Sequence, residues 1–219
     1  MSLLILNFHG VGPTLRNMEN GERECWLDQD FFESVLDLIQ GHPHVRLTVD
    51  DGNISDLSVI LPALLKRGLQ ATFFVCSGRL DQPTFLGESD VRILQKNGMR
   101  IGSHGVNHRV WPRLTAPQLH DEVVRSKNIL EKVCGHPIDR AACPFGAYNR
   151  RVLKALRHSG YQFVYTSDGG ATPANRWLQA RTTVTRSTSP RAIEDLVRWG
   201  PGTWRQSWTN VRKLLKRLR

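Results

Sequence analysis

The stretch that decides the fold is Leu-Thr-Val-Asp-Asp-Gly at residues 47–52, where two adjacent carboxylates follow a β-branched apolar run and are stopped by a glycine. This pattern predicts a buried strand over residues 45–49 that ends in a functional site. Because neighbouring side chains of an extended chain point to opposite sides, we expect Asp50 and Asp51 to serve two different tasks around one centre. One carboxylate can bind a metal while the other accepts a proton.

A matching segment, Ser-His-Gly-Val-Asn-His, lies at residues 103–108 and again follows a short apolar strand. Its two histidines, His104 and His108, are four positions apart. Together with Asp51 they provide two imidazoles and one carboxylate, a set that suits a catalytic divalent metal with an open position for water. The same ligands could hold iron in an oxygenase, but the strand-end Asp-Asp-Gly and the alternating α/β pattern weigh against that class.

Apolar runs and helix signals alternate along the rest of the chain. Strands are expected at residues 3–8, 45–49, 70–76, 99–103, 138–143, 161–165 and 180–185, with helices between them. This order predicts parallel βα units in an α/β fold, namely a closed or nearly closed (β/α) barrel of about seven parallel strands over residues 1–199 as a single domain. An open doubly wound sheet is the alternative. The barrel is favoured because polar residues follow strand after strand, and in a barrel those ends meet at one mouth.

Composition bounds the class of protein. With 219 residues, 40% hydrophobic and 23% charged, the chain has the profile of a soluble globular domain and no apolar run near the ~18 residues of a membrane span. The first residues lack a basic segment typical of a signal peptide. The four cysteines show no Cys-x-x-Cys spacing, so we expect buried, reduced thiols and a cytoplasmic location.

The net charge of +10 is concentrated at the C-terminal end, because residues 198–219 contain seven Lys or Arg residues and no acid. Residues 200–219 are expected to form a basic amphipathic helix, with Trp204 and Trp208 on its apolar stripe. This helix can dock on the barrel, or it can bind the anionic surface at the inner face of a membrane. Co-sedimentation with vesicles, for the protein with and without residues 200–219, distinguishes the two possibilities. A nucleic-acid partner is not expected, because the body of the chain lacks a basic-aromatic face.

The chain resembles the polysaccharide deacetylases, metal-dependent carbohydrate esterases that include chitin and peptidoglycan N-acetylglucosamine deacetylases. Residues 48–52 resemble their Thr-Phe-Asp-Asp-Gly motif, residues 103–108 resemble their second motif with two histidines, and residues 71–75 match the strand between them. The resemblance extends over about residues 3–186. It implies a distorted (β/α) barrel and a metal-dependent hydrolase that removes an acetyl group from an N-acetylated sugar. An O-acetyl esterase and a catalytically weak carbohydrate-binding relative are the alternatives.

The resemblance also implies roles for individual residues. Asp51, His104 and His108 correspond to ligands of a divalent metal, for which zinc is expected. Asp50 corresponds to the general base, and Phe145 lies in the family's third motif, where a backbone N–H stabilises the oxyanion.

Two departures from the family pattern affect the remaining roles. The arginine that usually begins the third motif is absent, and Arg181 is the expected substitute for orienting the base. The C-terminal Leu-x-His motif that supplies the general acid is also absent. In the branch that includes poly-N-acetylglucosamine deacetylases, a histidine at the end of the first strand is the acid, and His9 resembles it. Asp168 lies where the family places an aspartate that supports the acid.

Overall fold

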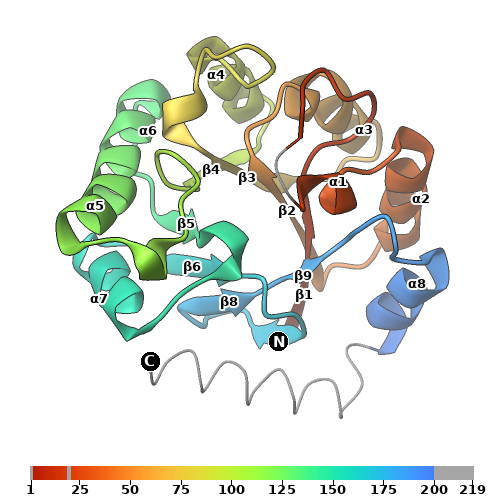
Figure 1. Ribbon diagram of the computed structural model, residues 1–219. Helices are drawn as coiled ribbons and strands as arrows, with labels where there is room; N and C mark the ends of the chain where they lie inside the picture. Colours follow the sequence, from red (N-terminus) through yellow and green to blue (C-terminus); the bar gives the residue numbers. More distant parts are fainter. Residues whose placement is uncertain (1, 19–20, 200–219) are drawn as a thin grey trace.

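The fold is a barrel of mainly parallel strands surrounded by helices, and the computed structural model describes residues 2–18 and 21–199 of it (Figure 1). The strands are β1 (Ser2–Phe8), β2 (Val45–Asp51), β3 (Ala71–Val75), β4 (Arg100–Ser103), β5 (Arg140–Ala142), β6 (Phe163–Thr166), β7 (Ala171–Pro173), β8 (Leu178–Ala180) and β9 (Thr182–Thr183). Strands β1 to β6 pair in parallel in the order of the chain. This arrangement confirms the predicted α/β class.

The barrel is closed by the segment at residues 178–183. Its first part, β8, pairs in parallel with β6, and its second part, β9, pairs in parallel with β1. Arg181 lies at the break between the two and is therefore inside the closed ring. The sequence predicted one strand at 180–185 instead of this broken one, and it did not predict β7, which pairs antiparallel with β1 at Ser2–Leu4. The open doubly wound sheet is excluded.

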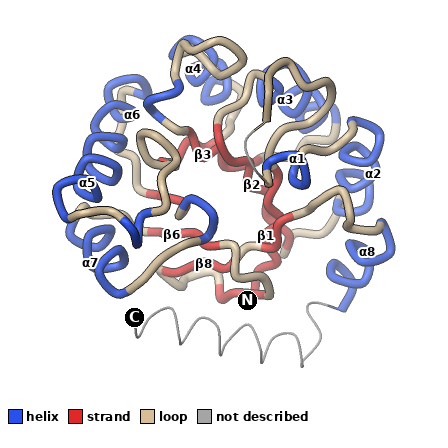
Figure 2. Tube along the Cα trace, in the orientation of Figure 1, coloured by secondary structure: helices blue, strands red, loops and turns tan. Residues whose placement is uncertain are grey.

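Helices cover the outside of the barrel (Figure 2). They are α1 (Glu22–Cys25), α2 (Gln29–Ile39), α3 (Leu61–Lys66), α4 (Glu88–Lys96), α5 (Ala116–His120), α6 (Ser126–Cys134), α7 (Arg150–His158) and α8 (Pro190–Trp199). Wide turns at Asp56–Ile60 and Asp121–Arg125 precede α3 and join α5 to α6, and tight turns occur at Ser77–Arg79, Trp111–Arg113 and Pro144–Gly146. Local chemistry sets several helix starts, since the Asp28 side chain accepts from the Phe31 amide and Thr115 forms a capping box with Gln118.

The apolar residues form two clusters. The larger one lies between the strands and the surrounding helices and includes Phe8, Val49, Phe73 and Leu156. A smaller cluster takes one residue from each of β1, β3, β5 and β6, namely Ile5, Phe74, Ala142 and Tyr165, and fills the middle of the barrel. Gly102 makes this filling feasible, because a Cβ at that position would lie 2.5 Å from the Phe74 ring.

Several sequence expectations concern the outer parts of the molecule. The expected helix at 200–219 lies outside the described residues, and its binding to a membrane stays a prediction. Within residues 2–18 and 21–199, no helix has the length and apolarity needed to span a membrane.

All four cysteines are free thiols, but only Cys76 and Cys143 are buried. Cys25 and Cys134 are partly exposed, and they are the last residues of α1 and α6.

Candidate active site

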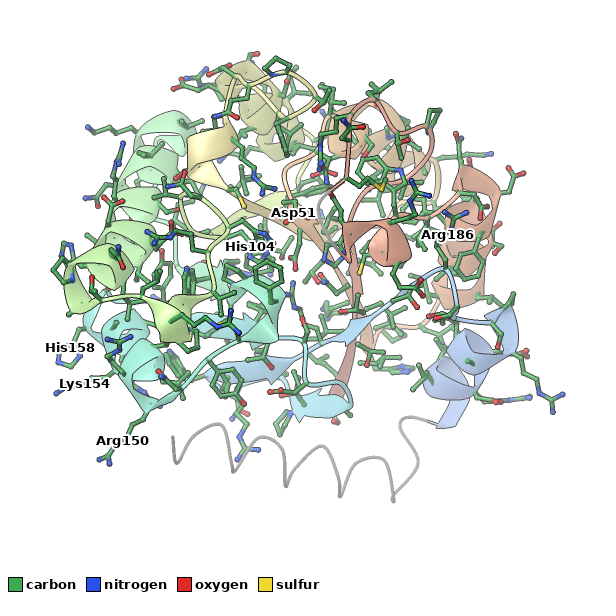
Figure 3. All side chains as sticks on the ribbon, in the orientation of Figure 1. Asp51, His104, Arg150, Lys154, His158 and Arg186 are labelled. Atoms are coloured by element: carbon green, nitrogen blue, oxygen red, sulfur yellow. The ribbon has the colours of Figure 1, made fainter. Side chains whose placement is uncertain are left out.

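Four of the predicted residues converge at the carboxyl-terminal ends of β2 and β4. The Asp51 Oδ1 atom lies 3.4 Å from His108 Nε2 and 3.7 Å from His104 Nε2. His104 Nε2 also lies 3.7 Å from Asp50 Oδ2. Asp50, Asp51 and His104 are buried, and in Figure 3 Asp51 and His104 lie at the centre of the barrel mouth.

Backbone geometry places both carboxylates on the same side, which corrects the expectation of opposite directions. Asp51 has a φ of 83°, in the left-handed region, so the regular alternation of β2 ends before its side chain. His108 and Phe145 also have positive φ values, 52° and 57°. Such conformations cost roughly 1–3 kcal/mol each and are concentrated at functional sites. Here the strained backbone conformations direct these side chains toward the barrel mouth.

The donor atoms of Asp51, His104 and His108 fit a divalent metal. They lie within 4.8 Å of one another. The Ala142 carbonyl, 2.9 Å from His104 Nδ1, accepts a hydrogen bond from that nitrogen, which leaves the Nε2 lone pair for a ligand. Burial lowers the pKa of His104 to about 4 despite the nearby Asp50, so the ring is neutral at pH 7. Asp51 Oδ1 is buried and has no hydrogen-bond donor among the described residues.

Arg181 holds Asp50 in a bidentate ion pair inside the barrel. Its Nη1 donates to Asp50 Oδ1 at 2.6 Å and its Nη2 to Asp50 Oδ2 at 2.8 Å. Asn7 Nδ2 also donates to Asp50 Oδ2, at 3.0 Å, while Asn7 Oδ1 accepts from Arg181 and Thr48. Arg181 is fully buried. Arg181 thus contacts Asp50, the carboxylate that the sequence predicted it to orient. Asn7 and Thr48, which were not predicted, belong to the same hydrogen-bond network.

These contacts determine the charge of the two carboxylates. Burial alone raises the pKa of Asp50, but the Arg181 guanidinium and the adjacent His104 outweigh burial and hold that pKa well below its usual range. Burial also opposes ionisation of Asp51, and the neighbouring His108, His9 and His104 lower its pKa more than burial and the Asp50 charge raise it. Both carboxylates are therefore ionised at neutral pH.

The loop that carries the histidines is held by Glu122, which the sequence analysis did not identify. This buried carboxylate accepts from the backbone N–H groups of Val106 and Asn107, at 3.0 and 3.1 Å, and from Trp111 Nε1. Gly105 has a φ of 84°, and a Cβ there would collide with Glu122. The only sequence signal was an acid at a position that the helical period of residues 115–133 places on the buried side.

We expect Glu122→Gln to weaken zinc binding by about 10- to 100-fold. The carboxylate accepts hydrogen bonds with two oxygens, whereas the amide has only one accepting oxygen and cannot serve all three donors. Competition with a chromophoric chelator measures this affinity. Glu194→Gln on the exposed face of α8 is the matched control and should bind zinc as the wild type does. Equal affinities in the two variants would mean that Glu122 does not position the loop.

The remaining predicted residues lie at the same end of the barrel. His9 follows β1, lies close enough to Asp50 and Asp51 to lower the pKa of both, and has a buried Nδ1 without a partner among the described residues. Phe145 is 58% exposed, and its ring centroid lies 4.4 Å from that of His108. Asp168 accepts hydrogen bonds from Tyr148 Oη and Thr166 Oγ1, at 2.8 and 2.9 Å. These bonds anchor Asp168 to β6 and the segment before α7.

The fold and the site define a (β/α) barrel with a candidate metal centre at its mouth, next to an arginine-paired carboxylate. The model of the polysaccharide deacetylase family matches residues 39–164. The chain belongs to the polysaccharide deacetylase family.

Individual relatives agree with this assignment. The chain is 31% identical to the peptidoglycan-N-acetylmuramic acid deacetylase PdaC of Bacillus subtilis over 114 residues, which are 52% of this chain and 24% of PdaC. It is 28% identical to a peptidoglycan-N-acetylglucosamine deacetylase of Bacillus cereus over 124 residues, 56% of each protein. The matches thus span between a quarter and about half of these relatives. The Streptococcus pyogenes deacetylase PplD, solved with acetate, has the same fold, with a TM-score of 0.77 at 22% identity over 88% of this chain and 96% of PplD.

Proposed function

We propose that the protein is a metal-dependent N-deacetylase, which hydrolyses the acetamide of an N-acetylated sugar to acetate and a free amine. The observation that carries this proposal is the convergence of Asp51, His104 and His108 beside an ionised carboxylate, Asp50, that is not needed as a fourth ligand. Family membership supports the same chemistry, and the names of the two bacterial relatives describe peptidoglycan amino sugars as their substrates.

Asp51, His104 and His108 would hold the metal, with zinc as the proposed ion because nitrogen and oxygen ligands in this number suit it. When bound, such an ion acidifies a coordinated water and polarises the acetamide carbonyl. Asp50 accepts the proton of the attacking water, and Arg181 and Asn7 fix the direction of its carboxylate. The Phe145 backbone N–H is the proposed donor to the oxyanion.

The leaving amine needs a proton as the C–N bond breaks, and His9 is the proposed donor. Histidine is the side chain most often used as a general acid in enzymes, because its ring nitrogens can both carry and release a proton. This role is supported by the place of His9 directly after β1, the strand that pairs with the β2 strand of Asp50 and Asp51. In this role Asp50 receives one proton from water and His9 gives one to nitrogen.

The proposal is tested by incubating the zinc-loaded protein with N-acetylglucosamine oligomers and measuring released acetate and free amine. Equal amounts of the two products are expected. Acetate release from O-acetylated sugars alone would support the esterase alternative, and binding of oligomers without any release would support the non-catalytic carbohydrate-binding alternative.

His9→Ala is expected to lower the rate on N-acetyl substrates by roughly 10²-fold or more, while zinc binding persists. An aryl acetate should be affected much less, because a phenoxide leaves without prior protonation. The two rates are measured side by side, with His120→Ala on the exposed end of α5 as the control. A small and equal loss on both substrates would remove His9 from proton donation.

A further inference from the structure

The barrel has a second opening at the amino-terminal ends of its strands, away from the mouth that holds the histidines. A cavity of about 890 Å³ lies there, and its lining includes Arg46, Arg100, Arg140 and Tyr165. Volumes between roughly 300 and 1,000 Å³ are typical of pockets that enclose small molecules. Neither the family's chemistry nor the proposed mechanism uses these residues.

The strand alternation directs all three arginines toward the barrel axis. Arg46 is four residues before Asp50 on β2, so both share the interior side of the strand. Arg100 is two residues before Gly102, whose missing side chain leaves room for Phe74 inside the barrel. Arg140 is two residues before Ala142, which belongs to the interior cluster. Strands β4 and β5 are neighbours in the barrel, and β3 lies between β2 and β4 (Figure 1).

The interior cluster separates this cavity from the catalytic carboxylates. Arg181 lies over the Phe74 ring, 5.3 Å from its centroid, on the mouth side. Arg140 lies 5.6 Å from the Phe163 ring centroid on the other side, where Phe163 contacts the same cluster. An occupant of the cavity would therefore touch the apolar layer from below without reaching Asp50.

The cavity carries an excess of positive charge. Among the described residues, Arg46 and Arg100 form no salt bridge, while Arg140 is paired with Asp139 at 2.7 Å. Three guanidinium groups thus face one carboxylate, which leaves a surplus of two positive charges. Arg46 and Arg100 are exposed residues of the cavity lining, and Arg46 Nη1 donates to the Pro43 and Val45 carbonyls. Arg100 also lies near enough to Asp139 and Tyr165 to affect their ionisation, so the charges and the phenol face a common space.

We propose that this cavity, the basal site, binds a small phosphate monoester with an aromatic or apolar body. Guanidinium groups match the oxygens of phosphate in paired hydrogen bonds. A phosphate monoester carries between about 1.5 and 2 negative charges at pH 7, which balances the surplus of two. The rings of Tyr165 and Phe163 and the side chain of Ile5 offer apolar surface to the ester group.

Calorimetric titration of the full-length, zinc-loaded protein with phenyl phosphate tests the proposal. We expect saturable binding of one ligand, weaker binding of benzoate because of its single charge, and none of phenol. The variant His104→Ala should bind phenyl phosphate as the wild type does, because it alters only the mouth. Loss of binding in His104→Ala would place the phosphate at the catalytic centre and overturn the proposal.

The variants Arg46→Gln and Arg100→Gln should each raise the Kd by about tenfold or more, the effect of losing one charge-assisted contact. Arg150→Gln is the control, since Arg150 projects from α7 away from the barrel (Figure 3). Unchanged affinity in the Arg46→Gln/Arg100→Gln double variant would overturn the basal site. If that variant does not fold, a salt series on the wild type decides, because affinity that is independent of ionic strength also contradicts an arginine-bound phosphate.

Discussion

Replacing Asp50 by asparagine is expected to lower kcat/KM for acetate release by about 10²- to 10⁴-fold, the contribution of a positioned general base. The amide keeps the shape of the side chain but cannot accept the proton of the attacking water. Zinc content should stay at the wild-type level, because the ligand atoms belong to Asp51, His104 and His108. Initial rates and metal analysis on the same preparation measure both quantities.

The exposed Asp30 of α2 provides a matched control, since Asp30→Asn makes the same charge change far from the mouth. This variant should retain the wild-type rate. An Asp50→Asn protein that turns over at the wild-type rate would remove Asp50 from the mechanism, whereas one that has lost its metal would show that Asp50 is needed for the metal site itself.

The Arg181→Met variant is expected to lose about 3–5 kcal/mol of the free energy of unfolding at pH 7, because it leaves Asp50 buried and uncompensated. Since the folded-state pKa of Asp50 is lowered, its charge stabilises the fold above the unfolded pKa of about 4 and stops doing so as the pH falls toward the folded value. Without Arg181, burial raises that pKa instead. The deficit of the variant should therefore narrow as the pH falls below that raised pKa, because there the folded variant binds the proton while Asp50 of the folded wild type stays ionised.

Urea unfolding of the metal-free proteins across this pH range measures the deficit. The double variant Asp50→Asn/Arg181→Met should recover part of the stability lost in Arg181→Met, because it no longer contains a buried unpaired charge. If the two substitutions simply add, the ion pair is not what Arg181 contributes to the fold.

The barrel could be predicted from the sequence because its strands are apolar runs whose ends carry polar residues. Short elements were harder to predict from the sequence. The strand β7 has three residues and is defined by pairing with Ser2–Leu4, which is a long-range contact that no local pattern reveals. The break in the closing strand likewise depends on Arg181, whose side chain must turn inward to reach Asp50.

The part of the site that could be predicted consists of residues whose type and spacing along the sequence indicate metal binding or catalysis. The set of Asp51, His104 and His108 was visible in this way. The direction of Asp51 was not, because it depends on a left-handed backbone conformation that overrides the strand alternation. Glu122 and Asn7 were missed for a different reason: a single polar residue in an apolar pattern does not reveal which buried groups it will satisfy.

The central claim is that one metal ion held by Asp51, His104 and His108 is required for deacetylation. Its most direct test is to strip the purified protein of metal, add zinc in steps and follow acetate release from an N-acetylglucosamine oligomer. The account predicts no release without metal, full recovery at one equivalent of zinc, and no recovery in His104→Ala at the same zinc concentration. Acetate release by the stripped protein, or equal recovery in His104→Ala, would contradict it.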